Sequence, residues 1–354
     1  YSQDAAVMGG SVGEMHAKKI ENLYGMAMKM GAPVVGLIDC AGLRLQEGLD
    51  ALNGFGRLYG CQTLASGVIP QIQAVFGSCG GGMAVASAMA DFTFMEDKAK
   101  LFVNAPNAIA ENDTDTSSAK FQSEEAGNVC MTGTEEDILA QIHTLISVLP
   151  ANNEDDMSYD ECADDLNRMC EGLENCVGDT ALALAMISDD SFYMEMKKDY
   201  APEMVTAFIR LNGATVGCVA NRSEVYTDGE KTATYDAALT AAGCEKAAAF
   251  VNFCNAFEIP VLTLVNVDGY KNCKCNEKKI AKAAARLTYA FANADVPKVT
   301  VVVGKANGTA GLTMNSKSIG SDIVYAWKNA KIGVMEAAPA VKIMYADEIA
   351  KADN

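Results

Sequence analysis

The chain has 354 residues, 50% of them apolar, enough to form one large hydrophobic core or two of ordinary size. Its formal net charge of −18 argues against nucleic acid or an anionic membrane as a partner, because the long-range field repels phosphate; a polyanionic ligand needs local positive charge. No apolar run in the sequence reaches the roughly 18 to 20 residues of a membrane span.

The first half is predicted to alternate helix and strand. Residues 1–4 (YSQD) are typical of the end of a strand, so we expect the sequence to be part of a longer protein. Apolar residues at helical spacing predict a helix over 14–30, which Gly31 and Pro33 stop. The next predicted elements are a buried strand at 34–38, a helix reaching about Ala65, a buried strand at 68–76, short strands near 91–95 and 100–103, and a helix near 134–149.

The second half repeats this order. Its predicted elements are helices at 244–257 and 278–293, strands at 260–266 and 298–303, a helix after the glycine turn that follows, and strands near 322–325 and 331–335. Strand alternating with helix indicates an α/β fold with a mostly parallel sheet. The acidic stretch 154–174 is the best boundary between the halves, and we expect domains over residues 1–152 and 153–354.

The two halves are copies of one unit. Residues 31–42 (GAPVVGLIDCAG) return as 258–269 (EIPVLTLVNVDG), and the prolines Pro33 and Pro260, like Pro70 and Pro297, are 227 positions apart. Each copy carries a turn of small residues after an apolar strand, at 77–82 and at 304–309. This duplication suggests an active site assembled between two related domains.

The glycine turns are candidate anion sites. Consecutive glycines let the backbone approach a ligand and point N–H groups at it, and the helix that follows adds its positive end. The alternative is that these glycines only permit close packing of helix against sheet. Neither turn has a phosphate-loop or dinucleotide fingerprint, and His16 is more often a structural hydrogen-bonding group than a base at such a position. Any chemistry would therefore come from backbone donors that stabilise negative charge.

The number and positions of the cysteines and histidines limit which redox and metal chemistry the chain can support. Many of the twelve cysteines lie scattered in apolar runs, as reduced core thiols do, which favours a cytoplasmic location. Cys273 and Cys275 form the only tight pair in the sequence, whereas a metal site needs a second pair or nearby histidines, and the chain has only His16 and His143. We expect no metal.

A series of short motifs spans nearly the whole chain: 9–16 (GGSVGEMH), 41–48 (AGLRLQEG), 65–71 (ASGVIPQ), 77–82 (GSCGGG), 91–95 (DFTFM), 250–257 (FVNFCNAF) and 296–300 (VPKVT). These motifs and their order resemble a known family, the carboxyltransferase subunits of biotin-dependent acyl-CoA carboxylases and of sodium-pumping acyl-CoA decarboxylases, of the propionyl-CoA carboxylase beta and methylmalonyl-CoA decarboxylase alpha type.

The resemblance implies two duplicated crotonase-superfamily (ββα spiral) domains in a homo-oligomer, a dimer or higher, with the active site between domains of two subunits. It implies two oxyanion holes, one for the enolate of a short acyl-CoA and one for the ureido oxygen of biotin, with no side-chain base. The catalytic amides would be those of Gly81, Gly82, Thr309 and Ala310. The substrate-binding residues would include Ala41, Gly42, Arg44 and Leu312.

The same resemblance implies the partners. The chain has no Met-Lys-Met biotinylation site, so biotin would arrive on a separate biotin carboxyl carrier protein. Biotin carboxylase or membrane decarboxylase subunits would complete the complex, and CoA thioester would be the substrate.

Two departures leave other functions open. Thr309 stands where the family has Gly, and a basic segment over 271–286 replaces a Gly-rich loop. This segment could meet CoA phosphates or a carrier, or be a solvated helix face. A non-catalytic scaffold subunit is one alternative. A crotonase-type acyl-CoA hydratase or isomerase is another, but it needs an acidic residue near the first turn, and the sequence has none between Gly77 and Met89.

Overall fold

The structure, a computed structural model, describes residues 1–155, 159–165 and 167–352. These residues form two compact units. The first comprises Tyr1–Asp160 with the short segments Met196–Tyr200 and Ala256–Glu258, and the second comprises Glu161–Glu195, Ala201–Asn255 and Ile259–Asn354. Within the acidic stretch 154–174, residues 156–158 and 166 lie outside the described residues. The domain boundary expected between residues 152 and 153 stays a prediction.

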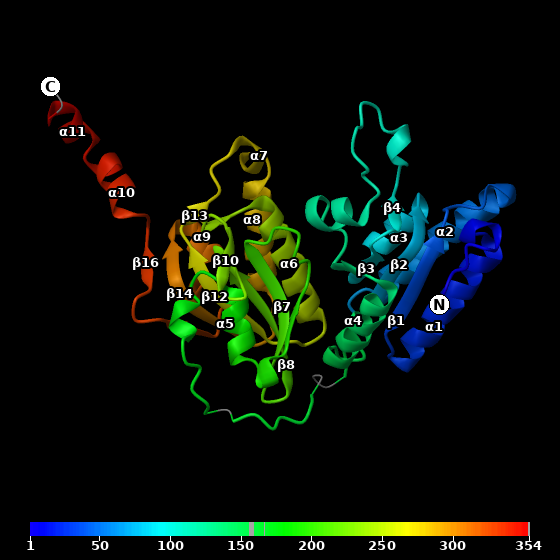
Figure 1. The fold of residues 1–354 in the computed structure, drawn as a ribbon, viewed down its shortest axis with the longest axis horizontal. Helices are drawn as coiled ribbons and strands as arrows, with labels where there is room; N and C mark the ends of the chain where they lie inside the picture. The colour runs from blue at the N-terminus through cyan, green and yellow to red at the C-terminus, as the bar shows by residue number, and fades with distance from the viewer. Residues whose placement is uncertain (156–158, 166, 353–354) are drawn as a thin grey trace. The chain divides into compact units, whose positions relative to one another are not determined.

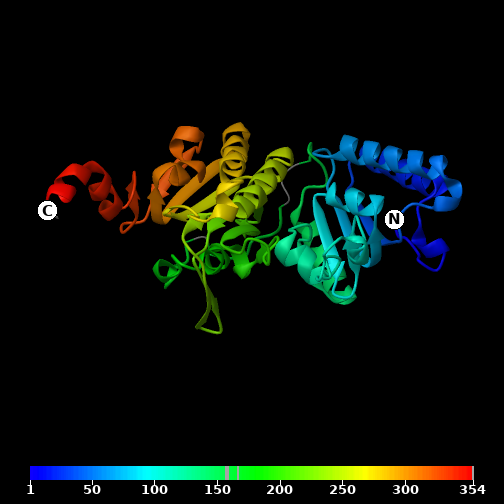
Figure 2. The same cartoon turned by 90° about the horizontal axis from the view of Figure 1, so that it is seen from above.

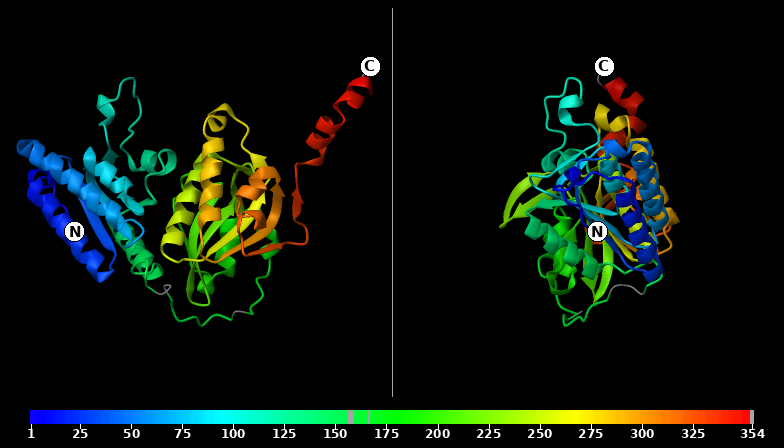
Figure 3. Two further views of the ribbon diagram at one scale, coloured as in Figure 1. Left: turned by 180° about the vertical axis from the view of Figure 1, so that it is seen from behind. Right: turned by 90° about the vertical axis from the view of Figure 1, so that its right-hand side faces the viewer.

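The first unit is a five-stranded parallel sheet in the order β1-β2-β3-β5, with β4 paired to β2, and it carries helices on both faces. Figure 1 and Figure 3 show α1 and α2 on one face of this sheet and α4 on the other. The elements are α1 (Glu14–Met30), β1 (Val34–Cys40), α2 (Leu49–Ala65), β2 (Gln71–Gly80), α3 (Gly82–Ala88), β3 (Phe92–Glu96), β4 (Lys100–Phe102), β5 (Met131–Gly133) and α4 (Glu135–Val148).

The second unit is built around a seven-stranded mixed sheet in the order β15-β14-β12-β8-β7-β6, with β16 paired to β14. Its helices are α5 (Thr180–Ile187), α6 (Ala241–Ala256), α7 (Lys274–Glu277), α8 (Ile280–Asn293), α9 (Gly308–Thr313), α10 (Ala337–Met344) and α11 (Ala346–Ala352). Its strands are β6 (Tyr193–Glu195), β7 (Met204–Leu211), β8 (Ala214–Asn221), β9 (Glu224–Thr227), β10 (Glu230–Thr234), β11 (Ala238–Leu239), β12 (Val261–Val267), β13 (Gly269–Tyr270), β14 (Lys298–Asn307), β15 (Ile323–Ala326) and β16 (Lys331–Gly333).

Strand β7 shows how both faces of the second sheet are covered. Val205, Ala207 and Ile209 pack in one apolar cluster with α5, whereas the ring of Phe208 contacts Phe250 of α6 at 5.0 Å between centroids. Successive residues of a strand point to opposite faces, so α5 and α6 cover opposite sides. Figure 2 shows the same arrangement, with α6 and α8 in yellow-green and yellow on one side of the sheet and the green segment that includes α5 on the other.

The predicted duplication is confirmed down to the register of the strands. The β1–β2 and β12–β14 ladders are both parallel, and each pair in the first recurs 227 positions later in the second. The equivalent pairs include Val34↔Gln71 and Val261↔Lys298, Ile38↔Val75 and Val265↔Val302, and Cys40↔Cys79 and Val267↔Ala306. The register of both ladders therefore shifts at the same point, between Ile38 and Cys40 in the first copy and between Val265 and Val267 in the second.

One polar side chain in each copy stabilises the backbone at this register shift. In the first copy Asp39 Oδ1 accepts a hydrogen bond from the Ser78 amide at 3.0 Å, and a Cβ on Gly77 would lie 2.1 Å from the same oxygen. In the second copy Asn266 Oδ1 accepts from the Lys305 amide at 3.1 Å, and a Cβ on Gly304 would lie 2.3 Å away. Each glycine is thus required by the close approach of the equivalent polar side chain.

The observed elements differ from the predicted ones where hydrogen bonding overrides composition. Strands β2 and β14 continue through Gly80 and Asn307, because β4 and β16 pair with their last residues, so most of each predicted glycine turn is strand. The helix expected over 278–293 is observed as α8, which begins at Ile280, and the short helix α7 that precedes it was not predicted. Strands β6, β7 and β8 were not predicted, and their antiparallel pairing makes the second sheet mixed.

Candidate active site

The first turn is formed by Gly81, between β2 and α3. Its φ of 57° lies in the left-handed region that favours glycine, which allows the chain to reverse directly into the helix. The Gly81 amide donates to the carbonyl of Phe102 at 2.9 Å. It is therefore engaged within the sheet rather than directed at a ligand, in contrast to the role predicted for it.

Gly82 begins α3, so its amide belongs to the first turn of the helix, whose N–H groups have no intrahelical acceptor. Its carbonyl accepts a hydrogen bond from the Tyr59 hydroxyl at 2.7 Å. A Cβ at this position would lie 3.1 Å from the Phe55 ring and 3.0 Å from that hydroxyl. The two aromatic rings of α2 thus hold the start of α3 and leave little space for a side chain at this position.

The second turn has the same geometry. Gly308 has a φ of 58°, matching Gly81, and it begins α9 directly after β14. Thr309 and Ala310 are the second and third residues of this helix, so their amides also lack intrahelical acceptors. Thr309 is exposed and Ala310 is buried. Thr309 and its equivalent Gly82 thus both lie in the first turn of a helix, and the exposed position accommodates the threonine side chain.

The register of the two copies changes how the predicted amides pair. At an offset of 227, Thr309 is equivalent to Gly82 and Ala310 to Met83, whereas Gly81 is equivalent to Gly308. The predicted pairs, Gly81 with Gly82 and Thr309 with Ala310, are one residue out of step. Together with the Phe102 contact, this favours the Gly82 and Met83 amides as the counterpart of the second pair.

A pocket of about 550 Å³ opens at the second turn. Thr309, Ala310 and Leu312, all predicted from the sequence, line it, and the Leu312 side chain is 47% exposed. The other lining residues come from the ends of β12, β14 and β16, from β13 and from the start of α9: Asp268, Gly269, Tyr270, Asn307, Gly308, Gly333 and Val334. Its volume lies within the roughly 300 to 1,000 Å³ of small-molecule sites, and most of its wall is apolar or backbone.

A polar network beside this pocket was not predicted from the sequence. Asp268 accepts hydrogen bonds from Lys305 Nζ at 2.8 Å and from Asn307 Nδ2 at 2.6 Å. Lys305 also pairs with Glu336 at 2.6 Å. The hydrogen bond from Lys305 holds the pKa of Asp268 below its usual range, so this carboxylate stays ionised and does not act as a general acid. The one feature of the sequence that could have indicated this network is the position of Asp268 directly after a buried strand.

The first copy places the remaining predicted residues at the end of β1. The Ala41 amide donates to the Gly9 carbonyl at 2.9 Å, and the Gly42 carbonyl accepts from the Val12 amide at 2.9 Å. Gly42 has a φ of 116°, and a Cβ there would lie 3.1 Å from the Gly80 carbonyl. These two residues hold the 9–12 turn against the sheet, and their role in binding substrate stays a prediction.

Arg44 lies in a pocket of about 340 Å³ that it shares with His16, Lys19 and Asp4. Its guanidinium donates to the Ser11 carbonyl at 2.8 Å and pairs with Glu47 at 2.9 Å, so its position is fixed. Desolvation by burial lowers the pKa of His16, whose Nδ1 lies 3.3 Å from the Ser11 carbonyl oxygen. The side chain is thus largely neutral at pH 7 and hydrogen-bonded to the backbone, as in its structural interpretation.

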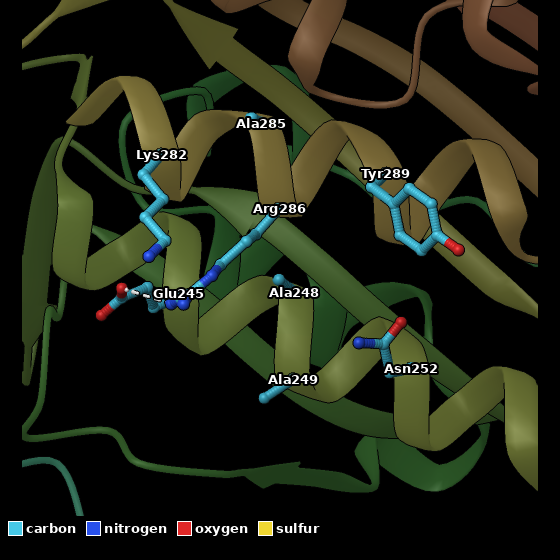
Figure 4. Close-up of a pocket in the computed structure, with 8 residues that line it drawn as sticks. All are labelled: Glu245, Ala248, Ala249, Asn252, Lys282, Ala285, Arg286 and Tyr289. Carbon is cyan, nitrogen blue, oxygen red and sulfur yellow. Dashed lines mark hydrogen bonds and ion pairs between the residues drawn. The ribbon is translucent and has the colours of Figure 1, made fainter. Parts of the chain in front are cut away.

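Another hollow, of about 580 Å³, lies between α6 and α8 and contains none of the predicted site residues. Figure 4 shows alanines of both helices along it and Lys282 and Arg286 extending from α8 toward Glu245 on α6. Arg286 pairs with Glu245 at 3.0 Å, and Lys271 pairs with Asp236. Part of the positive charge of the basic segment is therefore neutralised locally.

Within residues 1–155, 159–165 and 167–352, no cluster of three or more His, Cys, Asp and Glu side chains could hold a metal ion. No helix in that part of the chain is both long enough and apolar enough to cross a membrane.

Comparisons with known proteins identify the family. The family model of the carboxyl transferase domain matches residues 1–354. The chain is 37% identical to the propionyl-CoA carboxylase beta chain of Roseobacter denitrificans, over 99% of this chain and 70% of that protein. It is 38% identical to the methylmalonyl-CoA decarboxylase subunit alpha of Propionigenium modestum, over 100% of this chain and 70% of that protein.

The fold agrees with these relatives. The crystal structure of transcarboxylase 12S, with methylmalonyl-coenzyme A and methylmalonic acid bound, matches with a TM-score of 0.90 at 35% identity and covers 98% of this chain and 69% of that one. The α/β class and the crotonase-like fold predicted from the sequence are thereby confirmed. From the full-length family match and the duplicated sheets together, the chain belongs to the carboxyltransferase family.

Proposed function

We propose that the chain is the carboxyltransferase subunit of a biotin-dependent enzyme that acts on a short acyl-CoA, with propionyl-CoA and methylmalonyl-CoA favoured. The observation that carries this proposal is the match of the family over the entire chain, with relatives named for those two substrates. Carboxylation and decarboxylation use the same site in opposite directions, and both belong to the proposal.

The chemistry assigned to this chain is the stabilisation of developing negative charge. Amides of Thr309 and Ala310 in one copy, and of Gly82 and its neighbour in the other, would each hold one oxyanion, because they begin helices without intrahelical acceptors. Biotin, when bound, supplies or accepts the carboxyl group. The apolar wall at Leu312 and Val334 fits a short acyl chain and excludes water from the enolate.

CoA carries phosphates, and an acidic protein must provide positive charge for them. The pocket that Lys19 and Arg44 share offers two cationic side chains, of which Arg44 is held in place by hydrogen bonds, near the predicted substrate-binding residues Ala41 and Gly42. The basic segment 271–286 is a second candidate for CoA phosphates or for a carrier domain. If the pocket binds the CoA phosphates, Arg44→Ala should raise the KM for acyl-CoA more than the KM for CoA-free acyl thioesters. Equal increases in the two KM values would show that the pocket does not bind phosphate.

The quaternary organisation is also part of the proposal. The transcarboxylase 12S structure is described as a hexamer in a multienzyme core, and we propose a homo-oligomer, a dimer or higher, for this chain. A biotin carboxyl carrier protein, with biotin carboxylase or membrane decarboxylase subunits, would complete the complex. The free state of the cysteines in the described residues supports a cytoplasmic location.

The direct test is a decarboxylation assay of the full-length protein with malonyl-CoA and methylmalonyl-CoA, with and without free biotin, following the release of CO2 and acyl-CoA. Biotin-dependent turnover supports the proposal and ranks the acyl groups. Hydration or isomerisation of an enoyl-CoA would instead indicate the hydratase alternative. No turnover in protein shown to be folded and oligomeric would favour the scaffold alternative.

Leu312 tests whether the second pocket selects the acyl group. Leu312→Asp places a carboxylate on the apolar wall of this pocket. The kcat/KM for propionyl-CoA or methylmalonyl-CoA should therefore fall relative to that for acyl-CoAs with a more polar acyl group. Leu312→Met keeps an apolar wall and serves as the control. An unchanged acyl-CoA preference in Leu312→Asp would exclude the residue from the acyl site.

A further inference from the structure

The loop between β13 and α8 carries two thiols that the proposed function does not use. Cys273 is half-buried, Cys275 is exposed, and their sulfur atoms lie 2.6 Å apart. Figure 1 shows α7, which includes Cys275, at the end of this loop, away from the sheet. Both thiols are therefore accessible to small molecules, whereas Cys218 and Cys254 of the same unit are fully buried.

Chain geometry permits a bond between these sulfur atoms. Two consecutive Cα–Cα steps span at most about 7.6 Å, and any turn brings the ends into the roughly 4.4 to 6.8 Å range of disulfides. Hydrogen bonds from the Cys275 thiol and the Asn276 amide lower the pKa of Cys273, and the charge of Lys271 acts in the same direction. A larger share of Cys273 is then thiolate, the form that attacks disulfides.

The pair is mechanically linked to the rest of the second unit through Asn276, whose side chain is buried. The Asn276 amide donates to Cys273 Sγ at 3.4 Å, and its Nδ2 donates to the Lys271 carbonyl at 2.9 Å. Its Oδ1 accepts from the Ala241 amide, at the start of α6, at 2.7 Å. A new bond at Cys273 Sγ removes the sulfur that caps α7 and disturbs these contacts. Tyr270, at the other end of the same loop, lines the second pocket.

We propose that Cys273 and Cys275 form a reversible dithiol–disulfide site that exchanges with low-molecular-weight disulfides of the glutathione type. The Cys273 thiolate attacks one sulfur of the external disulfide, forms a mixed disulfide and releases one thiolate. Cys275 then attacks Cys273 Sγ and releases the second. Two protein thiols lose two electrons and two protons, and the external disulfide gains both and becomes two thiols.

The test uses the whole protein and does not depend on its enzymatic activity. The protein is equilibrated in buffers of oxidised and reduced glutathione, quenched in acid, alkylated and weighed intact, and the modified residues are located by peptide mass spectrometry. We expect the loss of two alkylation sites, at residues 273 and 275, in native protein, with full recovery on reduction. Hydrogen exchange of residues 270–279 should increase in the oxidised form.

Single variants separate this pathway from non-specific oxidation. Cys273→Ser should leave Cys275 unmodified or as a mixed disulfide with glutathione, and Cys275→Ser should accumulate the mixed disulfide on Cys273 because the resolving thiol is absent. Cys61→Ser, which changes another half-buried thiol, should behave as the parent. The proposal would be overturned if other cysteines were oxidised first or if no oxidation occurred before the protein unfolds. It would also be overturned if a chelator restored alkylation of the two thiols, because a bound metal would then have protected them.

Discussion

The two copies differ less in their backbone than in the side chains that support it. Asp39 and Asn266 make the same contact to the strand that follows, yet the first is an acceptor only, whereas Asn266 also donates to the Val177 carbonyl at 3.1 Å. The position that begins β2 is Gln71, and the equivalent position in β14 is Lys298, whose buried ammonium donates to carbonyls at the end of α8, including Phe291 at 2.8 Å. Equivalent geometry therefore tolerates different chemistry when each polar group finds a partner.

The largest effect is expected from removing one amide in either turn. Proline is tolerated in the first turn of a helix, so Gly82→Pro and Thr309→Pro delete an N–H group without breaking an intrahelical hydrogen bond. Each should reduce kcat by roughly 10² to 10³, the effect of losing one oxyanion donor. The measurement is decarboxylation of methylmalonyl-CoA at saturating biotin.

Matched variants separate the amide from the side chain. Gly82→Ala keeps the N–H and adds the Cβ that approaches Phe55, and Thr309→Val keeps the N–H and removes the hydroxyl. Activity that falls as far in these controls as in the proline variants would show that packing, rather than the amide, is responsible. A loss at only one turn would break the functional equivalence of the two copies.

The next effect compares the glycines that face the two polar side chains. Gly304→Ala should lower the free energy of unfolding by about 2 to 4 kcal/mol. The added Cβ displaces the Asn266 side chain, which then loses its buried hydrogen bonds with the Lys305 amide and the Val177 carbonyl. Gly77→Ala should cost about 1 to 2 kcal/mol, because only the Asp39 contact is lost. Urea unfolding measures both values.

Gly56→Ala is the control for this pair. Gly56 lies within α2 with no atom within 4 Å of the added Cβ, so the substitution should stabilise the protein by roughly 0.5 to 1 kcal/mol. Equal losses at Gly77 and Gly304 would contradict the additional role of Asn266.

The third effect depends on pH. Burial raises the pKa of Asp91, which accepts a hydrogen bond from the Gln71 amide at 2.8 Å, to about 6. The folded chain then binds more protons than the unfolded chain between about pH 4 and 6, and the free energy of unfolding falls as pH rises through this range. Between pH 4 and pH 7 the ionisation of this carboxyl should lower the free energy of unfolding by about 2 to 2.5 kcal/mol.

Asp91→Asn keeps an acceptor for the Gln71 amide and removes the titration. The variant should be more stable than the parent at pH 7 and close to it at pH 4, as measured by thermal unfolding across this range. Parallel stability curves for the two proteins would show that Asp91 titrates with its ordinary pKa.

The smallest effect comes from exchanging the two equivalent polar residues. Asn266→Asp replaces a donor to the Val177 carbonyl with an oxygen and should cost about 1 to 3 kcal/mol at pH 7. Asp39→Asn keeps the acceptor for Ser78 and should change stability by less than about 0.5 kcal/mol. Similar values for both exchanges in urea unfolding would mean that the Val177 contact contributes little.

Local sequence pattern determined much of the repeated unit. The prolines 227 positions apart, the helical spacing in 14–30 and the buried strands were sufficient to predict the duplication, α1, β1 and the position of both turns. The motifs were also specific enough to predict the family. These features depend on short-range periodicity and on turn residues, which are written directly in the chain.

What only the tertiary structure decided is where the polar groups find their partners. The glycines of β2 and β14 became strand because β4 and β16 supply hydrogen bonds from more than twenty residues away, and the Gly81 amide is occupied by Phe102 for the same reason. The network of Asp268, Lys305 and Asn307, and the Asn276 contact to α6, likewise join distant segments. Such pairings satisfy backbone and buried polar groups across the sheet, so no local window of sequence contains both partners.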